Sequence, residues 1–192
     1  MPEITRPLLP GGEPRLGRRH LWQGSGIPKT AAQTELEHWN PDPPAGLAAS
    51  MAPPEGAAPG ASVAVPITLE TLDSGHRVPS GDPERYYLLE AVAADASGAQ
   101  IGRMSYRVGQ IWTWWPEAER LSDNRMVPGE VRELALYFVQ PPGGATVTLE
   151  LTHYRISPAN ASYHDLEGYP TNRAVSREEV RIPAVDSGTA GG

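Results

Sequence analysis

The chain has 192 residues, 39% of them hydrophobic, and it contains 21 prolines, 20 glycines and no cysteine. This length allows one domain of moderate size plus an extension, and so much proline and glycine favours turns and extended segments over long helices. The formal net charge of -7 disfavours nucleic-acid binding, which needs a basic surface. The lack of cysteine excludes disulfides, thiolate metal sites and covalent haem attachment through a CxxCH motif.

Residues 1–60 contain 11 of the 21 prolines, so they are predicted to form an extended, polyproline-like arm without strand pairing or long helices. Arg18 and Arg19 lie in the basic first part of this arm. A short helix is predicted over 30–39, ended by Pro41. Residues 186–192 are predicted to form a flexible tail.

From residue 61 onward the apolar residues alternate with a period of two, which is typical of a strand with one buried face. Val63, Val65, Ile67 and Leu69 share that face, and Pro66 among them predicts an edge strand or a bulge. Further strands are predicted over 86–95, 100–107, 131–139, 146–156 and 180–185, joined by glycine- and proline-rich turns. This order predicts an all-β chain in which residues 61–185 form an antiparallel β-sandwich.

The loop over 72–85 holds the most varied chemistry of the sequence. His76 is its one versatile ligand, set among glycines, prolines and charged side chains. The carboxylates of Asp73, Asp82 and Glu84 can offer oxygen ligands to a cation. Two arginines of the same loop lie among them, so charge pairing within the loop is favoured over cation binding.

No self-contained active site is predicted. The sequence holds no GxSxG nucleophile elbow, no phosphate-binding glycine pattern and no pair of histidines at zinc-binding spacing. His153 falls inside a predicted strand and is expected to lie on its exposed face.

Four short motifs, in a fixed order, carry a resemblance to a known family. They are GHRVPSG at 75–81, RYYLLEAVAADASG at 85–98, DNRMVPGE at 123–130 and LTHYR at 151–155. Through them the stretch 61–157 resembles the Ig-like β-sandwich domain at the C-terminal end of multihaem c-type cytochromes, including those similar to cytochrome c554. The resemblance implies an antiparallel Ig-like β-sandwich, here preceded by an extended Pro-rich N-terminal arm.

The same resemblance implies contacts with haem. In such cytochromes the histidine of the GH loop can serve as a haem axial ligand, which implies that role for His76. The stretch RRHLWQG at 18–24 is similar to the histidine-bearing stretch before the sandwich and points to His20. Because the chain has no CxxCH motif, no haem is expected to be bound covalently. The chain then either lies beside a cytochrome on another chain, where haem contact in trans would arise, or has kept the fold and lost the redox role.

Trp112, Trp114 and Trp115 lie close together, and the first and second of them are expected on one face of an extended segment. Both faces cannot easily be core in a small sandwich. One face is therefore expected to meet the arm, a partner subunit or a membrane interface. The alternative is that one tryptophan is core and the arm covers the other two.

These features predict a non-enzymatic accessory subunit of a larger electron-transfer complex with a multihaem cytochrome, such as a photosynthetic reaction centre. The predicted partner-binding residues are Arg18, Arg19, Trp22, Trp112, Trp114 and Trp115. The alternative is a stand-alone ligand- or carbohydrate-binding module that uses the face 112–115. The complex is expected to face the periplasm at a membrane surface, although the sequence shows neither a signal pattern nor an apolar run of ~18 residues.

Overall fold

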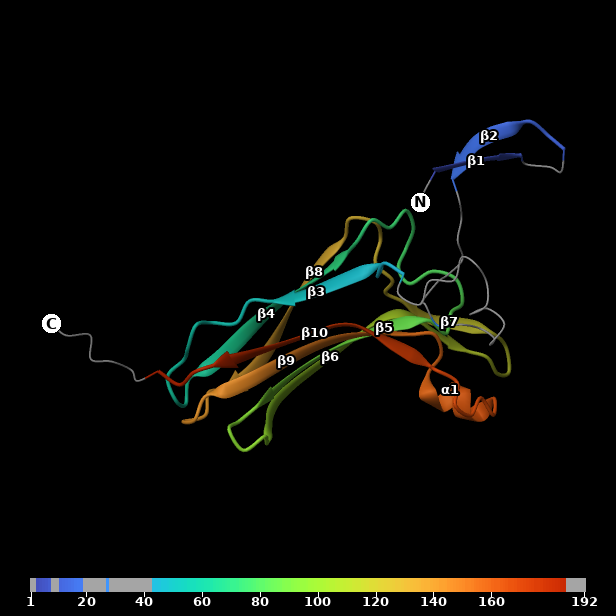
Figure 1. Ribbon diagram of the computed structural model, residues 1–192. Helices are drawn as coiled ribbons and strands as arrows, with labels where there is room; N and C mark the ends of the chain where they lie inside the picture. The colour runs from blue at the N-terminus through green and yellow to red at the C-terminus, as the bar shows by residue number, and fades with distance from the viewer. Residues whose placement is uncertain (1–2, 8–10, 19–26, 28–42, 186–192) are drawn as a thin grey trace. The chain divides into compact units, whose positions relative to one another are not determined.

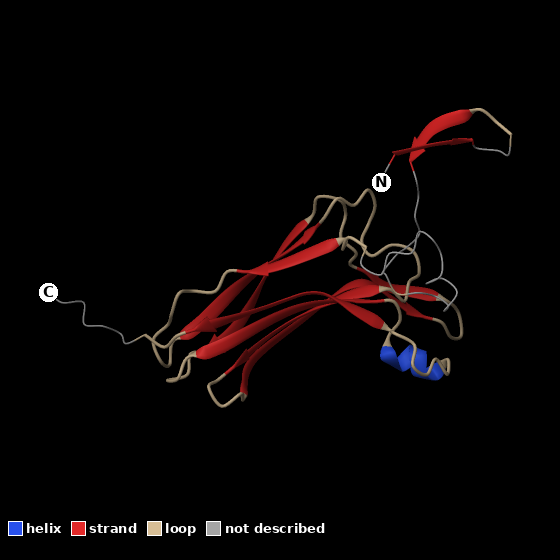
Figure 2. Cartoon of the chain, viewed as in Figure 1, coloured by secondary structure: helices blue, strands red, loops and turns tan. Residues whose placement is uncertain are grey.

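Antiparallel strands dominate the computed structural model, which describes residues 3–7, 11–18, 27 and 43–185 (Figures 1 and 2). The chain divides into two units, Met1–Pro43 and Pro44–Gly192. The predicted helix over 30–39 lies outside the described residues, as does the predicted tail. The β-sandwich lies within the second unit.

In the first unit, β1 (Glu3–Pro7) and β2 (Pro14–Arg18) form an antiparallel hairpin. The prediction that residues 1–60 would form no strand pairing is therefore wrong for this segment. Pro7 and Pro14 pair with each other at the ends of their strands, where a missing backbone donor costs little. Gly11, with a φ of 77°, lies in the connection, where the left-handed region favours glycine.

The larger sheet of the second unit has five strands in the order β10-β9-β5-β6-β7. These strands are β5 (Tyr86–Ala94), β6 (Gln100–Thr113), β7 (Glu119–Asp123), β9 (Ala145–Tyr154) and β10 (Asn172–Ile182). The predicted strands over 86–95 and 100–107 pair as the hairpin of β5 and β6, with Gly98 at a φ of 86° in its turn. The helix α1 (Pro158–Tyr163) follows β9, and Ser157 caps it by accepting a bond from the Asn160 amide.

The smaller sheet has the order β3-β4-β8, with β3 (Leu47–Met51), β4 (Ser62–Thr71) and β8 (Val131–Val139). Its strand β3 comes from the stretch predicted as arm, so the compact unit begins at Pro44 and not at residue 61. The prediction of an edge strand at Pro66 is also wrong, because β4 lies between two strands. Pro66 is tolerated there because it lies just beyond the last β3 pair, Met51 and Ile67, where its carbonyl still accepts a bond from the Ala52 amide at 3.0 Å.

The core lies between the inner faces of the two sheets of this unit. The predicted alternation in β4 is confirmed, since Val63, Val65, Ile67 and Leu69 are all buried. They pack in one cluster with buried residues of the larger sheet, such as Leu89. Burial of each such side chain stabilises the fold by about 1.5–3 kcal/mol. The prediction of an all-β chain with an antiparallel β-sandwich is confirmed.

One close backbone approach joins the two sheets. A Cβ on Gly102 of β6 would lie 2.8 Å from the carbonyl oxygen of Tyr137 and 2.9 Å from the Cβ of Phe138, both in β8. Only glycine fits at such a contact without moving the backbone. No helix in the described residues is long and apolar enough to cross a membrane.

Candidate functional site

Two exposed tryptophans of the sandwich lie where β6 ends and turns toward β7. Trp115 is 85% exposed and Trp114 is 53% exposed, whereas Trp112 is half-buried. The rings of Trp112 and Trp114 stack with centroids 5.5 Å apart, which confirms that these two share one side. The alternative with one tryptophan in the core is wrong for these three residues. We call Trp112, Trp114 and Trp115 the tryptophan surface.

Hydrogen bonds hold two of these indole rings in place. Trp112 Nε1 donates to Gln110 Oε1 at 3.0 Å, and Trp114 Nε1 donates to Glu84 Oε1 at 3.2 Å. Glu84 also accepts a bond from the Asn160 side chain of α1. The tryptophan surface is therefore already ordered, which lowers the entropic cost of binding a partner.

A groove of about 440 Å³ lies beside the tryptophan surface, on the outer face of the five-stranded sheet. Its lining comprises Pro83, Glu84, Tyr86, Leu88, Arg107, Gln110, Ile111, Trp112, Ser157 and Asn160. The Tyr86 ring stacks on Tyr154 with centroids 4.5 Å apart, and the Arg107 guanidinium lies 4.3 Å from the Tyr86 centroid. Burial raises the pKa of Tyr86 and lowers the pKa of Arg107. We call this hollow the outer groove.

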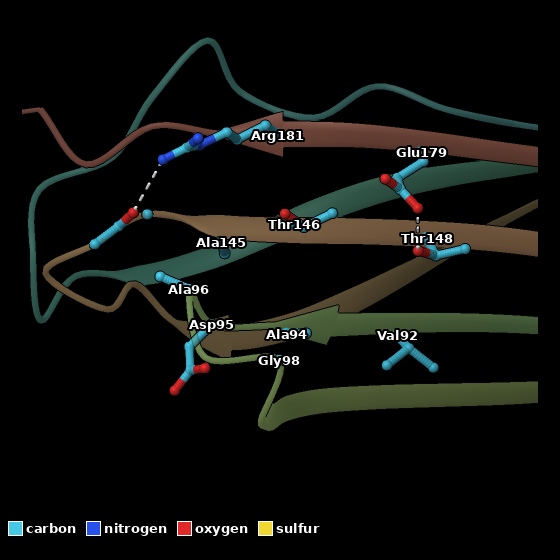
Figure 3. A pocket seen from close by; sticks show the side chains of 12 residues that line it. Val92, Ala94, Asp95, Ala96, Gly98, Ala145, Thr146, Thr148, Glu179 and Arg181 are labelled. Atoms are coloured by element: carbon cyan, nitrogen blue, oxygen red, sulfur yellow. Dashed lines mark hydrogen bonds between the residues drawn. The ribbon is translucent and has the colours of Figure 1, made fainter.

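A second hollow, of about 450 Å³, lies at the opposite end of the five-stranded sheet, and Figure 3 shows its lining. Several of its polar groups already form hydrogen bonds within the chain. Asp95 accepts bonds from the Ser97 amide at 2.8 Å and the Ala99 amide at 3.0 Å, and Thr148 bonds to Glu179 at 3.4 Å. Of the described residues of the second unit that were predicted to bind a partner or haem, none lines this hollow.

Three arginine side chains lie around the carboxylate of Asp123, at the end of β7. It makes two bonds with Arg125, at 2.9 and 2.8 Å, and lies 3.3 Å from Arg120 and 3.7 Å from Arg77. The bonds from Arg125 hold the pKa of Asp123 far below its ordinary value. The prediction that Arg77 pairs within its own loop is therefore wrong, because the loop lies against β7 and its arginine meets a better-placed acid there.

His76 is exposed in this loop, and its Nδ1 lies 3.1 Å from the carbonyl oxygen of Arg77. His20 lies outside the described residues, as do Arg19 and Trp22, and Arg18 is the last residue of β2. Among the residues that the structure describes, no group of three histidine or acidic side chains could hold a metal ion.

His153 is buried, so the prediction of a surface histidine is wrong. Residues two apart in a strand face the same side, and His153 therefore lies on the core face with Leu151. Its ring stacks on Tyr87 with centroids 4.2 Å apart, and its Nε2 has no hydrogen-bond partner. Burial, with a smaller contribution from three nearby arginines, lowers the pKa of His153 to about 3.

The outer groove contains residues that the sequence did not single out, above all Tyr86, Arg107 and Asn160. Glu84 was noted only as a cation ligand or charge partner. The one usable signal was the aromatic pair at 86–87, which falls at the start of a predicted strand. The groove itself depends on α1, where no helix was predicted.

Fold and site together define an antiparallel β-sandwich with a tryptophan surface and a groove at one end. The fold is similar to that of a penta-heme cytochrome c552 from Thermochromatium tepidum, with a TM-score of 0.56 and 18% sequence identity. The match covers 71% of this chain and 40% of the cytochrome chain, so the chain spans well under half of that protein. No known protein family and no curated protein matches the sequence. At this identity the likeness shows a shared fold alone.

Proposed function

We propose that this chain is a non-enzymatic accessory subunit of an electron-transfer assembly that contains a multihaem cytochrome. The assembly would face the periplasm at a membrane surface, as a photosynthetic reaction centre with its cytochrome does. The observation that carries this proposal is the exposed, pre-ordered tryptophan surface. The similarity of fold to a part of a penta-heme cytochrome supports the choice of partner.

The strand order supports an Ig-like sandwich. The order β10-β9-β5-β6-β7 corresponds to strands G-F-C-C′-C″ of an immunoglobulin sheet, and β3-β4-β8 corresponds to A-B-E of the facing sheet. In this scheme the tryptophan surface lies where C′ ends and turns toward C″.

The tryptophan surface has the composition of a protein-binding hot spot. Tryptophan is the residue most enriched at such positions, and contiguous apolar exposure on a soluble domain marks interaction sites. Ile111 and Leu121, 47% and 61% exposed, add apolar area on the same two strands. We assign Arg18, Arg19 and Trp22 to a second contact with the partner, because the first part of the arm carries a basic cluster in an otherwise acidic chain.

Replacing Trp114 and Trp115 together by Ala is expected to weaken binding to the multihaem cytochrome of the source organism by about 30-fold or more. The two indoles are exposed in the free chain and would be buried in the complex. Their removal therefore takes away contact area without opening the core. The affinity would be measured by calorimetry between purified proteins. Tyr137→Ala is the matched control, because this aromatic residue is 67% exposed on the outer face of the other sheet. Equal weakening by both variants, or no binding of the wild-type chain, would contradict the proposal.

Replacing His76 by Ala is expected to leave the absorption spectrum and redox potential of the partner cytochrome unchanged. The imidazole already contacts a backbone carbonyl of its own loop, and accessory docking needs no haem ligand from this chain. A shifted haem absorption band in the complex with the variant would instead assign His76 to the haem.

A second candidate function is a stand-alone ligand- or carbohydrate-binding module. The outer groove favours it, because Trp112 forms part of the groove lining. Such a module would bind its ligand without any partner protein.

A further inference from the structure

We propose that the outer groove is a binding site for a neutral saccharide, with Trp112 supplying its aromatic face and Glu84 and Arg107 its hydrogen bonds. This inference rests on the second candidate function and is independent of docking to a cytochrome. The groove volume of about 440 Å³ falls in the range of small-molecule sites.

The apolar part of the lining suits the C–H face of a sugar ring. Tyr86 and Leu88 project from the outer face of β5, opposite the core, and Trp112 and Ile111 line the groove from β6. Trp112 is held by its stack on Trp114 and by its bond to Gln110, so its ring orientation is fixed before a ligand arrives. A ligand with one apolar face gains the free energy of burial there without reordering the protein.

The polar part of the lining suits hydroxyl groups. An ionised carboxylate offers about four acceptor sites, and two donors already fix Glu84, so acceptor capacity is left. Arg107 has five N–H donors, and in the described part of the chain its guanidinium donates no hydrogen bond. A hydroxyl both donates and accepts, so neighbouring sugar hydroxyls can use both side chains.

The charge of the groove favours a neutral ligand over an ionic one. Glu84 and Arg107 carry opposite charges and lie close enough that the carboxylate acts on the pKa of the guanidinium. Their fields largely cancel for an ion in the groove. A proline-rich peptide fits less well, because the indole N–H groups of Trp112 and Trp114, the donors for peptide carbonyls, are already bonded to Gln110 and Glu84.

The test uses the full chain and four neutral tetrasaccharides, built from glucose, xylose, mannose or N-acetylglucosamine. Binding would be followed by tryptophan fluorescence and by calorimetry. At least one tetrasaccharide is expected to bind at millimolar concentration or below, and Arg107→Ala is expected to weaken that binding about tenfold or more. Arg103→Ala is the matched control, because Arg103 lies on the same face of β6 but pairs with Glu90 at 2.5 Å, away from the groove.

Glu84→Gln, which keeps the side-chain shape, is expected to weaken binding as well and guards against misfolding of the arginine variant. Tyr137→Ala is expected to leave saccharide binding unchanged, since Tyr137 lies on the outer face of the other sheet and does not line the groove. Saccharide binding by the chain without any cytochrome present separates this inference from cytochrome docking. Failure of all four saccharides to bind, equal effects of Arg107→Ala and Arg103→Ala, or preferential binding of decaproline would each overturn the inference.

Discussion

Acidification from about pH 7 to about pH 4 is expected to destabilise the sandwich by about 3 kcal/mol through His153 alone. Each extra proton that the unfolded state binds lowers the free energy of unfolding by about 1.4 kcal/mol per pH unit of acidification. The folded chain keeps His153 neutral until about pH 3, whereas the unfolded chain protonates it near the ordinary value of 6.5. The unfolded state therefore binds more protons between these values. The contribution is fully present above about pH 6.5 and is lost as the pH falls below it.

The groups around His153 explain why its proton is so unfavourable. The ring is buried against Tyr87, and Arg85, Arg155 and Arg173 place positive charge nearby. A charged imidazole would lose its hydration and face three like charges.

His153→Phe is the matched variant, because phenylalanine can keep the stack on Tyr87 but cannot titrate. Urea unfolding between pH 4 and pH 7 should give a flatter stability profile for this variant than for the wild type. His76 and His164 are exposed and remain in both proteins, so the difference between the profiles isolates His153. Parallel profiles for the two proteins would contradict the prediction.

Asp123→Asn is expected to lower the free energy of unfolding by about 1–3 kcal/mol, because removal of this half-buried carboxylate leaves the hydrogen-bond donors of Arg125 without their charged acceptor. The Asp123 side chain is only 10% exposed and joins β7 to the loop that carries Arg77. Asparagine keeps the size of the side chain and loses its charge. Three arginines would then face each other across a neutral amide.

Arg120→Gln is the control for this network. Its side chain is 51% exposed, and a pair of that kind contributes less than about 1 kcal/mol. Both variants would be compared by thermal and chemical unfolding. An equal and small loss in both would show that Asp123 acts as an ordinary surface acid. The depressed pKa keeps Asp123 ionised over the pH range of the His153 experiment, so its titration does not add to that profile.

Periodic strands were the predictable part of the fold. The alternation in β4 and the limits of β8 could be predicted because apolar residues recur with a period of two, which is typical of a strand with one buried face. Strand β3 was missed because its small residues lie within a proline-rich stretch, and only pairing with β4 makes it a strand. Strand β7 was missed because its residues are polar and mostly exposed, so no burial pattern marks it.

The candidate site was less predictable than the fold. The shared side of Trp112 and Trp114 follows from their spacing, but the outer groove does not. Glu84 and Asn160 are 76 residues apart, and they meet only because α1 follows β9, the strand that pairs with β5. Arg107 reaches Tyr86 through the register of β5 and β6, which hairpin length alone does not fix. The error at His153 had a different origin. Its polarity was taken as a sign of exposure, although residues two apart in a strand share a face and place it with buried Leu151.

Strand β10 forms one edge of the five-stranded sheet, and its charges bear on aggregation. An unpaired edge can recruit a strand from another molecule, and natural proteins prevent this with charged side chains. Along its 11 residues β10 carries Arg173, Arg177, Glu178, Glu179 and Arg181, and Arg177 lies 3.7 Å from both Glu150 and Glu179. A second copy stacked on this edge would have to desolvate that ladder of charges. Edge-to-edge growth into fibres is thereby disfavoured along this strand.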